Sequence, residues 1–311
     1  MRKIIIDTDC GSDDAVAIAM ALKESAVEIL MLSTVVGNVP MQQATTNTLT
    51  TLGYTNTYHP PVYMGCERPL LRKSSYAYET HGIDGMGDIG LVPPENATAA
   101  DGNGVIKILE TLMAHEPNVI EIVCLGPLTN IAVAISLSLE TMRRAKNITI
   151  MGSAGFGIGN VTPVAEFNIW HDAEAAKIVL DSGLPITFVG WDACLGDAAF
   201  DEDDIQRLRA TGALGDFMIN CNKLLVEFNI NRFGRGILDF ADPVAMAVAL
   251  WPEIVTQCDK YHCEVDVSDG PGYGALIIDR NNEFGGEPNA YVCTQVDAKL
   301  HKEKLFQLAS Q

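Results

Sequence analysis

The sequence lacks the long hydrophobic runs of a membrane protein and has few basic residues. No stretch of about 18 consecutive apolar residues occurs, although 48% of the 311 residues are hydrophobic. Lysine and arginine total 21 against 40 aspartates and glutamates, which gives a formal net charge of −19. Nucleic-acid binding depends on basic patches. The composition therefore argues against a membrane span and against a nucleic-acid partner.

Paired cysteines and a secretion signal are also missing. Eight cysteines are scattered along the chain, and none forms a C-x-x-C pair. Most lie in apolar segments, which indicates buried and reduced thiols. The amino-terminal segment MRKIIIDTDCG turns acidic after an apolar run that is too short for a signal peptide. We therefore expect a cytoplasmic protein.

What the sequence does contain is an alternation of short apolar runs with helical patterns. Strands are expected at 3–6, 27–36, 119–125, 148–151 and 185–190, and helices at 13–22, 41–52, 104–114, 128–137, 173–181, 201–209, 214–228, 242–250 and 302–309. Apolar runs without polar alternation are typical of strands that crossover helices bury on both faces. The pattern predicts a mostly parallel, Rossmann-like open α/β sheet flanked by helices. Smaller strands at 261–295 indicate an irregular α+β part, and we expect a single domain over residues 1–311.

Four aspartates crowd into the segment IIIDTDCGSDDAVAIAM. Asp7 and Asp9 follow the first expected strand, and Asp13 and Asp14 begin the helix after it. Ligands of open α/β sheets bind at the carboxyl ends of the strands. Two like charges about 4 Å apart repel each other by about 4 kcal/mol at the effective dielectric of a protein surface. The cluster therefore needs raised pKa values or a cation, and oxygen donors favour Ca²⁺ or Mg²⁺.

Three interpretations of this cluster are open from the residues alone. One is a hydrated helix start without a ligand, because a helix amino terminus accommodates one carboxylate. Another is a phosphatase of the D-x-D-x-[TV] type, although the fifth position here is Gly11. A third is a different metal-dependent hydrolase. An EF-hand loop fails, since Ile18 is the twelfth residue from Asp7, where that loop needs a glutamate.

The segment D-T-D-x-G-x-D-D-A resembles the opening of the nucleoside hydrolases, the inosine-uridine preferring N-ribohydrolases. Seven later segments resemble blocks of that family in the same order: TVVGN (34–38), GCERPLLRK (65–73), HGIDGMG (81–87), LGPLTNIA (125–132), ITIMG (148–152), VAEFNIWHDAEAA (164–176) and ADPVAMA (241–247). The resemblance covers nearly the whole chain. It implies calcium-dependent hydrolysis of the N-glycosidic bond of ribonucleosides, giving ribose and a free purine or pyrimidine base. It also implies a homodimer or homotetramer.

The resemblance further implies roles for individual residues. The Ca²⁺ ligands would be Asp9, Asp14, Asp242 and the backbone carbonyl of Leu125, with Asp9 also the general base that takes a proton from water. The ribose contacts would be Asp13, Asn38, Asn160, Glu166 and Asn168, which we call the ribose set. Asp7 is expected to steady Asp9 or its loop.

The spacing of Glu166 and Asn168 is informative by itself. They stand two residues apart in the apolar run VAEFNI, which predicts an extended segment that presents both side chains on one face. Polar residues at alternate positions of an apolar run indicate a site.

The group that protonates the leaving base is not matched. Family members that prefer inosine and uridine commonly carry a histidine directly before the last calcium aspartate, where this chain has Ala241. His81 is the remaining candidate. The segment NINRFGRG is expected to form a mobile loop over the base, with Asn229, Asn231, Arg232 and Arg235 as possible contacts, and Trp170 is expected in the core. A catalytically weak homologue that only binds nucleosides or sugars is therefore the main alternative.

Overall fold

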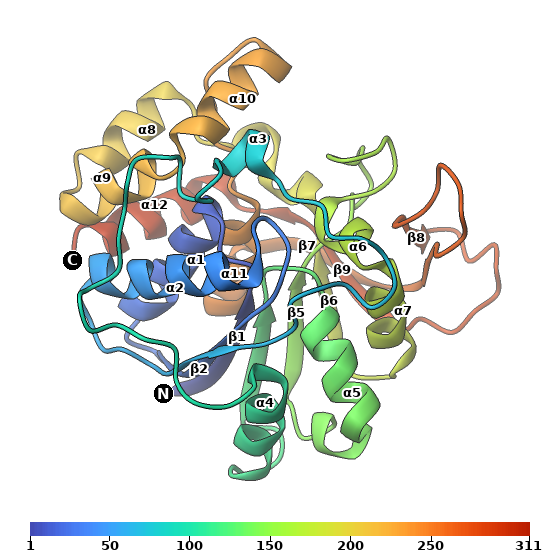
Figure 1. The fold of residues 1–311 in the computed structure, drawn as a ribbon. Helices are drawn as coiled ribbons and strands as arrows, with labels where there is room; N and C mark the ends of the chain where they lie inside the picture. Colours follow the sequence, from blue (N-terminus) through green and yellow to red (C-terminus); the bar gives the residue numbers. More distant parts are fainter.

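A computed structural model describes residues 1–311, and its centre is one nine-stranded sheet (Figure 1). The strands lie in the order β3-β2-β1-β4-β5-β6-β9-β7-β8. Those from β3 across to β9 run parallel, whereas β7 pairs antiparallel with both β9 and β8. The predicted mostly parallel open sheet is confirmed. The strand bounds are β1 (Arg2–Thr8), β2 (Val27–Thr34), β3 (Val62–Met64), β4 (Ile120–Cys124), β5 (Asn147–Met151), β6 (Ile186–Val189), β7 (Val255–Val265), β8 (Leu276–Asp279) and β9 (Ala290–Val296).

Helices cover both faces of this sheet, with α1, α2, α11 and α12 on one face and α4, α5 and α7 on the other (Figure 1). None of them has the length and apolar character needed to cross a membrane. Their bounds are α1 (Ser12–Lys23), α2 (Met41–Thr55), α3 (Tyr78–His81), α4 (Gly104–Met113), α5 (Thr129–Met142), α6 (Phe167–His171), α7 (Ala173–Asp181), α8 (Glu202–Arg209), α9 (Ala213–Asn220), α10 (Lys223–Phe233), α11 (Ala241–Leu250) and α12 (Ala298–Ala309), with 3₁₀ helices η1 (Trp191–Cys194), η2 (Gly196–Ala198) and η3 (Pro252–Ile254).

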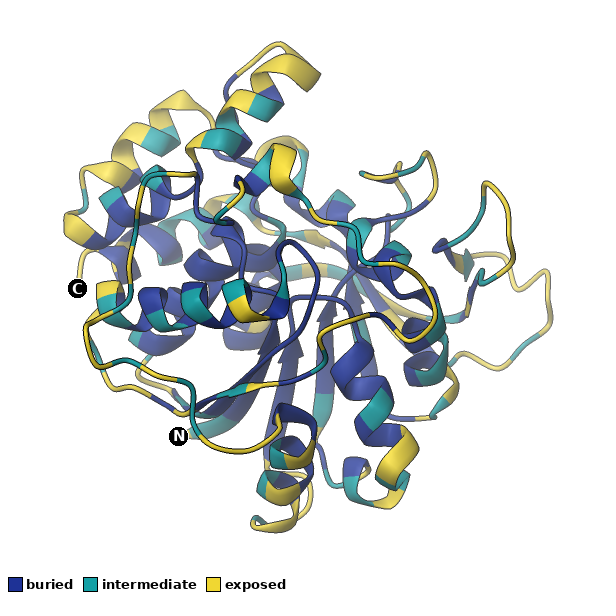
Figure 2. Ribbon diagram, in the orientation of Figure 1, coloured by how far each residue is buried: buried dark blue, intermediate teal, exposed yellow.

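Successive residues of β1 point to opposite faces of the sheet and so belong to two hydrophobic cores. Ile4 and Ile6 pack in the cluster that includes α1 and α11, whereas Ile5 packs in the cluster of α4, α5 and α7. All three are at most 1% exposed, and Figure 2 shows the central strands buried between the helix layers. This two-sided burial explains why the sequence shows an unbroken apolar run here.

The strand order places a crevice between β1 and β4. From β1 the chain moves outward to β2 and β3, and from β4 it moves outward in the other direction to β5 and β6. The loops that follow β1 and β4 therefore diverge, and ligands of doubly wound sheets bind at such a switch point. The aspartates after β1 and Leu125 after β4 lie at this place.

One helix prediction is wrong in detail. The helix expected at 214–228 is two helices, α9 and α10, and α10 continues to Phe233 through half of the segment expected as a loop. The break is at Asn222, whose side-chain amide donates to the carbonyls of Met218 and Ser12, both at 2.9 Å. Gly234, with φ of 73°, ends α10 in the left-handed conformation that glycine adopts without strain.

Candidate active site

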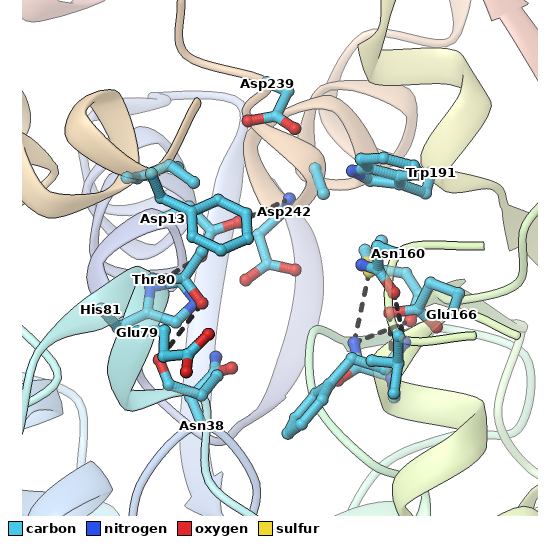
Figure 3. Close-up of a pocket in the computed structure, with 18 of the residues that line it drawn as sticks. Asp13, Asn38, Glu79, Thr80, His81, Asn160, Glu166, Trp191, Asp239 and Asp242 are labelled. Atoms are coloured by element: carbon cyan, nitrogen blue, oxygen red, sulfur yellow. Dashed lines mark hydrogen bonds and ion pairs between the residues drawn. The ribbon is translucent and has the colours of Figure 1, made fainter. Parts of the chain in front are cut away.

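A cavity of about 600 Å³ opens at the carboxyl ends of the parallel strands, beside the switch point (Figure 3). The loops after β2, β3, β4 and β5 contribute to it, together with η1 after β6, the starts of α1 and α11, and helices α3, α6 and α10. Eight of the residues expected in the site line the cavity: Asp13, Asn38, His81, Leu125, Asn160, Glu166, Asn168 and Asp242. Asp9 and Asp14 are fully buried behind Asn38, which hydrogen-bonds both of them.

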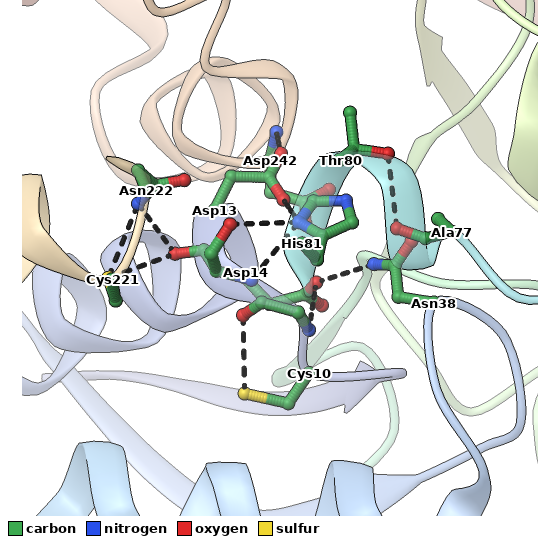
Figure 4. A network of polar contacts seen from close by, with 12 residues as sticks. Cys10, Asp13, Asp14, Asn38, Ala77, Thr80, His81, Cys221, Asn222 and Asp242 are labelled. Atoms are coloured by element: carbon green, nitrogen blue, oxygen red, sulfur yellow. Dashed lines mark hydrogen bonds and ion pairs between the residues drawn. The ribbon is translucent and has the colours of Figure 1, made fainter. Parts of the chain in front are cut away.

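Asp13, Asp14 and Asp242 form what we call the carboxylate cluster (Figure 4). One oxygen from each lies within 4.8 Å of the others. The backbone N–H of Asp242 donates to Asp13 Oδ2 at 3.4 Å. Asp14 is fixed by Thr8 Oγ1, which donates at 2.5 Å, and by the backbone N–H of Gly11, which donates at 2.8 Å. Residues 13 and 242 meet because α11 packs directly against α1.

No basic side chain neutralises the carboxylate cluster. No lysine or arginine nitrogen lies within 4.0 Å of its oxygens, and His81 Nδ1 approaches Asp13 Oδ1 only to 3.9 Å. Burial, with repulsion from Asp13, raises the pKa of Asp14, and the same two effects raise the pKa of Asp242 well above its ordinary value. Buried carboxylates without a counter-charge suit a hard divalent cation, so these residues could hold a metal ion.

Asp9 lies outside the carboxylate cluster, and its two oxygens have different surroundings. Oδ2 accepts a hydrogen bond from the backbone N–H of Asn38 at 2.6 Å, whereas Oδ1 is buried without any partner. Two glycines allow this packing, since a Cβ on Gly37 would lie 2.0 Å from Oδ2 and one on Gly126 would lie 2.6 Å from Oδ1. Burial and then the charge of Asp14 raise the pKa of Asp9 well above its ordinary value. The unpartnered oxygen is a second sign that this corner fits a cation.

The extended segment predicted around Glu166 and Asn168 is wrong, although both side chains do line the cavity. Residues Phe167–His171 form the short helix α6, and Glu166 caps its start. The Glu166 carboxylate accepts hydrogen bonds from the backbone N–H groups of Asn168, Ile169 and Ser153 at 2.9, 3.3 and 3.1 Å. These bonds stabilise a helical turn over a strand. Burial still raises the pKa of Glu166 to about 7.

Asn168 and Asn160 each bond to the backbone of the site. Asn168 Nδ2 donates to the carbonyl of Leu125 at 2.7 Å, the oxygen that the resemblance assigns to calcium. A carbonyl oxygen carries two lone pairs, so this bond leaves one for a metal. Asn160 Oδ1 accepts from the backbone N–H of Phe167 at 2.8 Å and thereby orders the loop before α6.

His81 and Asp7 lie in different environments. His81, at the end of α3, is 8% exposed, and its Nδ1 lies 2.8 Å from Ser12 Oγ. Asp7 is completely buried and does not line the cavity. Its Oδ1 accepts from Ser33 Oγ and, at 2.7 Å, from Asn130 Nδ2. Asp7 therefore ties β1 to β2 and α5.

Several cavity residues differ from the sequence-based expectation. Trp170, expected in the core, is half-buried and lines the cavity. Asn229 and Arg232 line it as expected, whereas Asn231 and Arg235 are exposed elsewhere. The sequence reasoning missed Trp191, Phe228 and Asp239. Of these three residues, only Asp239 could have been found from the sequence, because it is a charged residue three positions before Asp242 in the otherwise apolar segment ILDFADPVA.

Known proteins share this sequence pattern. A family model described as inosine-uridine preferring nucleoside hydrolase matches residues 4–303. The pyrimidine-specific ribonucleoside hydrolase RihB of Escherichia coli is 33% identical over 297 residues, which cover 95% of this chain and 93% of RihB. An uncharacterized protein of Schizosaccharomyces pombe is 43% identical over 190 residues, 61% of each chain.

Solved structures share the fold over the whole chain. A plant nucleoside hydrolase, the PpNRh1 enzyme, superimposes with a TM-score of 0.93 at 28% identity and 99% coverage of both chains. A purine-preferring ribonucleoside hydrolase from Gardnerella vaginalis gives a TM-score of 0.89, also at 28% identity and 99% coverage of both chains. Since the family model spans almost every residue and the relatives align from end to end, this chain belongs to the inosine-uridine preferring nucleoside hydrolase family and is an enzyme that hydrolyses N-glycosidic bonds of ribonucleosides.

Proposed function

We propose that this enzyme hydrolyses purine and pyrimidine ribonucleosides in a Ca²⁺-dependent reaction that releases ribose and the free base. The observation that carries the proposal is a single cavity where two polar groups of residues face each other, Asp13 and Asp242 on one side and Glu166 on the other (Figure 3). Ribose hydroxyls need such partners, because a buried polar group left unpaired costs about 1–3 kcal/mol.

Asp9, Asp14, Asp242 and the carbonyl of Leu125 are the proposed calcium ligands. Calcium accepts mixtures of carboxylate and carbonyl oxygens, about 6–8 in number. The raised pKa values of Asp9, Asp14 and Asp242 and the unpartnered Oδ1 of Asp9 support this choice. When bound, the ion would compensate the buried charge and lower the pKa of a water molecule.

The chain's own residues would bind ribose and move the proton of the attacking water. The ribose set orients the sugar, and the Asp9 carboxylate, which lies buried behind Asn38, takes the proton from water as general base. The transition state of N-glycoside cleavage resembles an oxocarbenium ion, so the nearby carboxylates stabilise its positive charge. His81 is a candidate for a catalytic contact because it lines the same cavity beside Asp13.

We propose activity on both classes of base. The cavity is also lined by Trp191, Phe228 and Phe167, whose rings suit any flat heterocycle. Relatives differ in this respect, since RihB is named pyrimidine-specific and the Gardnerella vaginalis enzyme purine-preferring. We also propose a cytoplasmic location and, from the family resemblance, a homodimer or homotetramer.

A phosphatase of the D-x-D type finds no support in the geometry. Its nucleophile would be Asp7, a residue of strand β1 whose Oδ1 is engaged by Ser33 and Asn130 and so serves to link β1 with β2 and α5. The main alternative is a weakly active homologue that only binds nucleosides. A measurement of turnover distinguishes it from the proposed enzyme.

The deciding experiment is a panel of nucleosides assayed with purified, chelator-treated protein. Inosine, guanosine, adenosine, uridine and cytidine are incubated with Ca²⁺, with Mg²⁺ or with EDTA, and base and ribose are quantified separately. We expect equimolar release of both products that depends on Ca²⁺. The variant Asp9→Asn should lose at least ~100-fold in kcat, the low end for a general base, while its circular dichroism spectrum stays unchanged. Calorimetric binding without turnover would support the binding homologue, and neither binding nor turnover would overturn both.

A further inference from the structure

The cavity contains a carboxyl group that the proposed reaction does not yet use. Asp239 lies three residues before Asp242, lines the cavity and is only 6% exposed. Figure 3 shows it at the opposite end of the cavity from Asn38, between the side of Asp13 and the side of Trp191. Asp239 thus lies at the end of the cavity where Trp191, a ring that could hold a base, also lies.

Asp239 is firmly oriented but keeps one oxygen open. Asn229 Nδ2 donates to Asp239 Oδ1 at 2.6 Å and to the carbonyl of Ile237 at 3.0 Å. Asp239 Oδ2 accepts no hydrogen bond from another residue. Asp239 lines the cavity, so a carboxyl oxygen without a protein partner can carry a proton there and donate it to a ligand.

The surroundings of Asp239 favour its protonated form. Burial raises the pKa of Asp239 to about 6, and the charge of Asp13 adds to this effect, while the Asn229 amide and Arg232 oppose it. The titratable and charged groups around it are Asp13 on α1, Asp242 on α11, Arg232 on α10 and the Cys194 thiol in η1. A general acid works best when its pKa lies near the working pH.

The other candidate groups at this end are less suited to donate a proton to the base. Ala241 lines the cavity but has no proton to give. His81 lies at the Asp13 end, where its Nδ1 interacts with Ser12 Oγ and with the Ser12 backbone N–H at 3.3 Å (Figure 4).

We propose that Asp239 is the catalytic residue that protonates the departing base, an inference that rests on the proposed ribonucleoside hydrolysis. As the C1′–N bond breaks, its electron pair stays on the base, and the Asp239 proton passes to a ring nitrogen. The water oxygen bonds to C1′, and its proton passes to Asp9. The products are ribose and a neutral base. Asp9 then releases to solvent the proton it took from water, and Asp239 regains one proton from solvent, so the enzyme returns to its starting state.

The experiment compares substrates that need this proton with one that does not. Wild type, Asp239→Asn and His81→Ala are assayed with inosine, with uridine and with 4-nitrophenyl β-D-ribofuranoside, whose phenolate leaves without protonation. For Asp239→Asn we expect kcat on the nucleosides to fall at least ~100-fold, with the aryl riboside turned over at nearly the wild-type rate. Asp239→Glu, which keeps an acid, should recover part of the loss.

The wild-type pH profile gives a test that needs no variant. As Asp239 ionises above about pH 6, kcat/KM for nucleosides should decline, and the aryl riboside should not show this decline. If both substrates decline together, the assignment is wrong, even where Asp239→Asn fails to fold. Three results with the variants also overturn the assignment. The first is a loss of kcat in Asp239→Asn that is equal on all three substrates, and the second is no loss in that variant on the nucleosides. The third is a loss of kcat on the nucleosides alone in His81→Ala but not in Asp239→Asn.

A matched control is Asp192→Asn. Burial also raises the pKa of Asp192 to about 6, but this carboxyl lines a separate cleft, so its replacement should leave the ratio of nucleoside to aryl riboside activity unchanged. A change of that ratio in the control would overturn the specific assignment to Asp239. If the wild type cleaves no riboside, the proposed function itself is overturned. If it cleaves ribosides but Asp239→Asn affects all of them equally, only the assignment of Asp239 is overturned.

Discussion

Among single residues, Asp242 offers the sharpest test of the metal site, because it alone brings the second half of the chain into the carboxylate cluster. In chelator, Asp242→Asn should melt no lower than wild type, since its pKa is already raised well above the ordinary value and the neutral amide removes repulsion. With Ca²⁺ at 100 times its Kd, the free energy of unfolding of the wild type should rise by about 2.7 kcal/mol. That of the variant should rise far less. Scanning calorimetry with and without Ca²⁺ measures both quantities, and equal gains would contradict the assignment.

Many residues of the site could be predicted from the sequence because their position relative to the nearest strand also determines where they lie in the fold. Asp13, Asn38 and Glu166 follow or flank strands, and the carboxyl ends of strands converge in a parallel sheet. Trp191 and Phe228 were not predictable, since their approach to the cavity depends on how η1 and α10 pack. Asp239 carried a sequence signal, but only its tertiary contact with Asn229 explains it.

Among the elements, α10 closes one side of the cavity through Arg232. Its guanidinium lies 5.1 Å from the Trp191 ring centre and 3.5 Å from the carbonyls of Gly159 and Asn160. Arg232→Ala should raise KM for nucleosides several-fold, since an exposed cation–π contact contributes about 0.5–1 kcal/mol. The melting temperature should barely change. Steady-state kinetics checks this expectation, with Arg232→Lys as the control that keeps the charge, and a fall in kcat at unchanged KM would contradict it.

The two elements that the sequence mispredicted share a physical cause. In both, a side chain bonds to backbone groups and so overrides the hydrophobic period. The Glu166 carboxylate turns an alternating segment into helix α6, and Asn222 divides one apolar helical pattern into α9 and α10 by bonding to Ser12, which is distant in sequence. Helix ends of this kind depend on long-range contacts, whereas α7 matches its predicted bounds because its pattern is local.

Across the whole molecule, buried carboxyls make stability depend on pH when no metal is bound. Burial raises the pKa of Glu166 to about 7 and that of Asp192 and Asp239 to about 6, against about 4 in an unfolded chain. Between about pH 4 and 7 the folded protein therefore holds more protons than the unfolded one, so its free energy of unfolding falls as pH rises.

Burial lowers the pKa of His171 and His301 to about 4, and the pKa of the buried Glu121 is also lowered, so these three groups act in the opposite direction. They are fewer than the buried carboxyls with raised pKa values, which also include Asp7 at about 7 and the carboxyls of Asp9, Asp14 and Asp242.

We therefore expect the chelator-treated protein to be more stable at about pH 5.5 than at about pH 8. Urea denaturation at the two pH values measures the difference, and Glu166→Gln should reduce it because one titrating group is removed. Stability that rises with pH over this window would contradict the expectation.

At the same scale, the sequence predicted the parallel sheet but not its complete strand order. The βαβ alternation fixes neighbours such as β1–β2 and β4–β5, because right-handed crossovers are nearly invariable. The last three strands pair differently: β9 inserts between β6 and β7, although β7 precedes it in the chain. That choice depends on burial of Val292 and Cys293 against the two cores, which periodicity does not encode.

The contact between α1 and α11 has a consequence for biosynthesis. When the ribosome has synthesised residues 9–14, only some of the carboxylates of the site exist. Asp242 is added after more than three quarters of the 311 codons have been read. A nascent or prematurely terminated chain therefore presents uncompensated aspartates and no closed pocket for an ion. Loading with metal would in this way mark polypeptides whose translation has passed the eleventh helix.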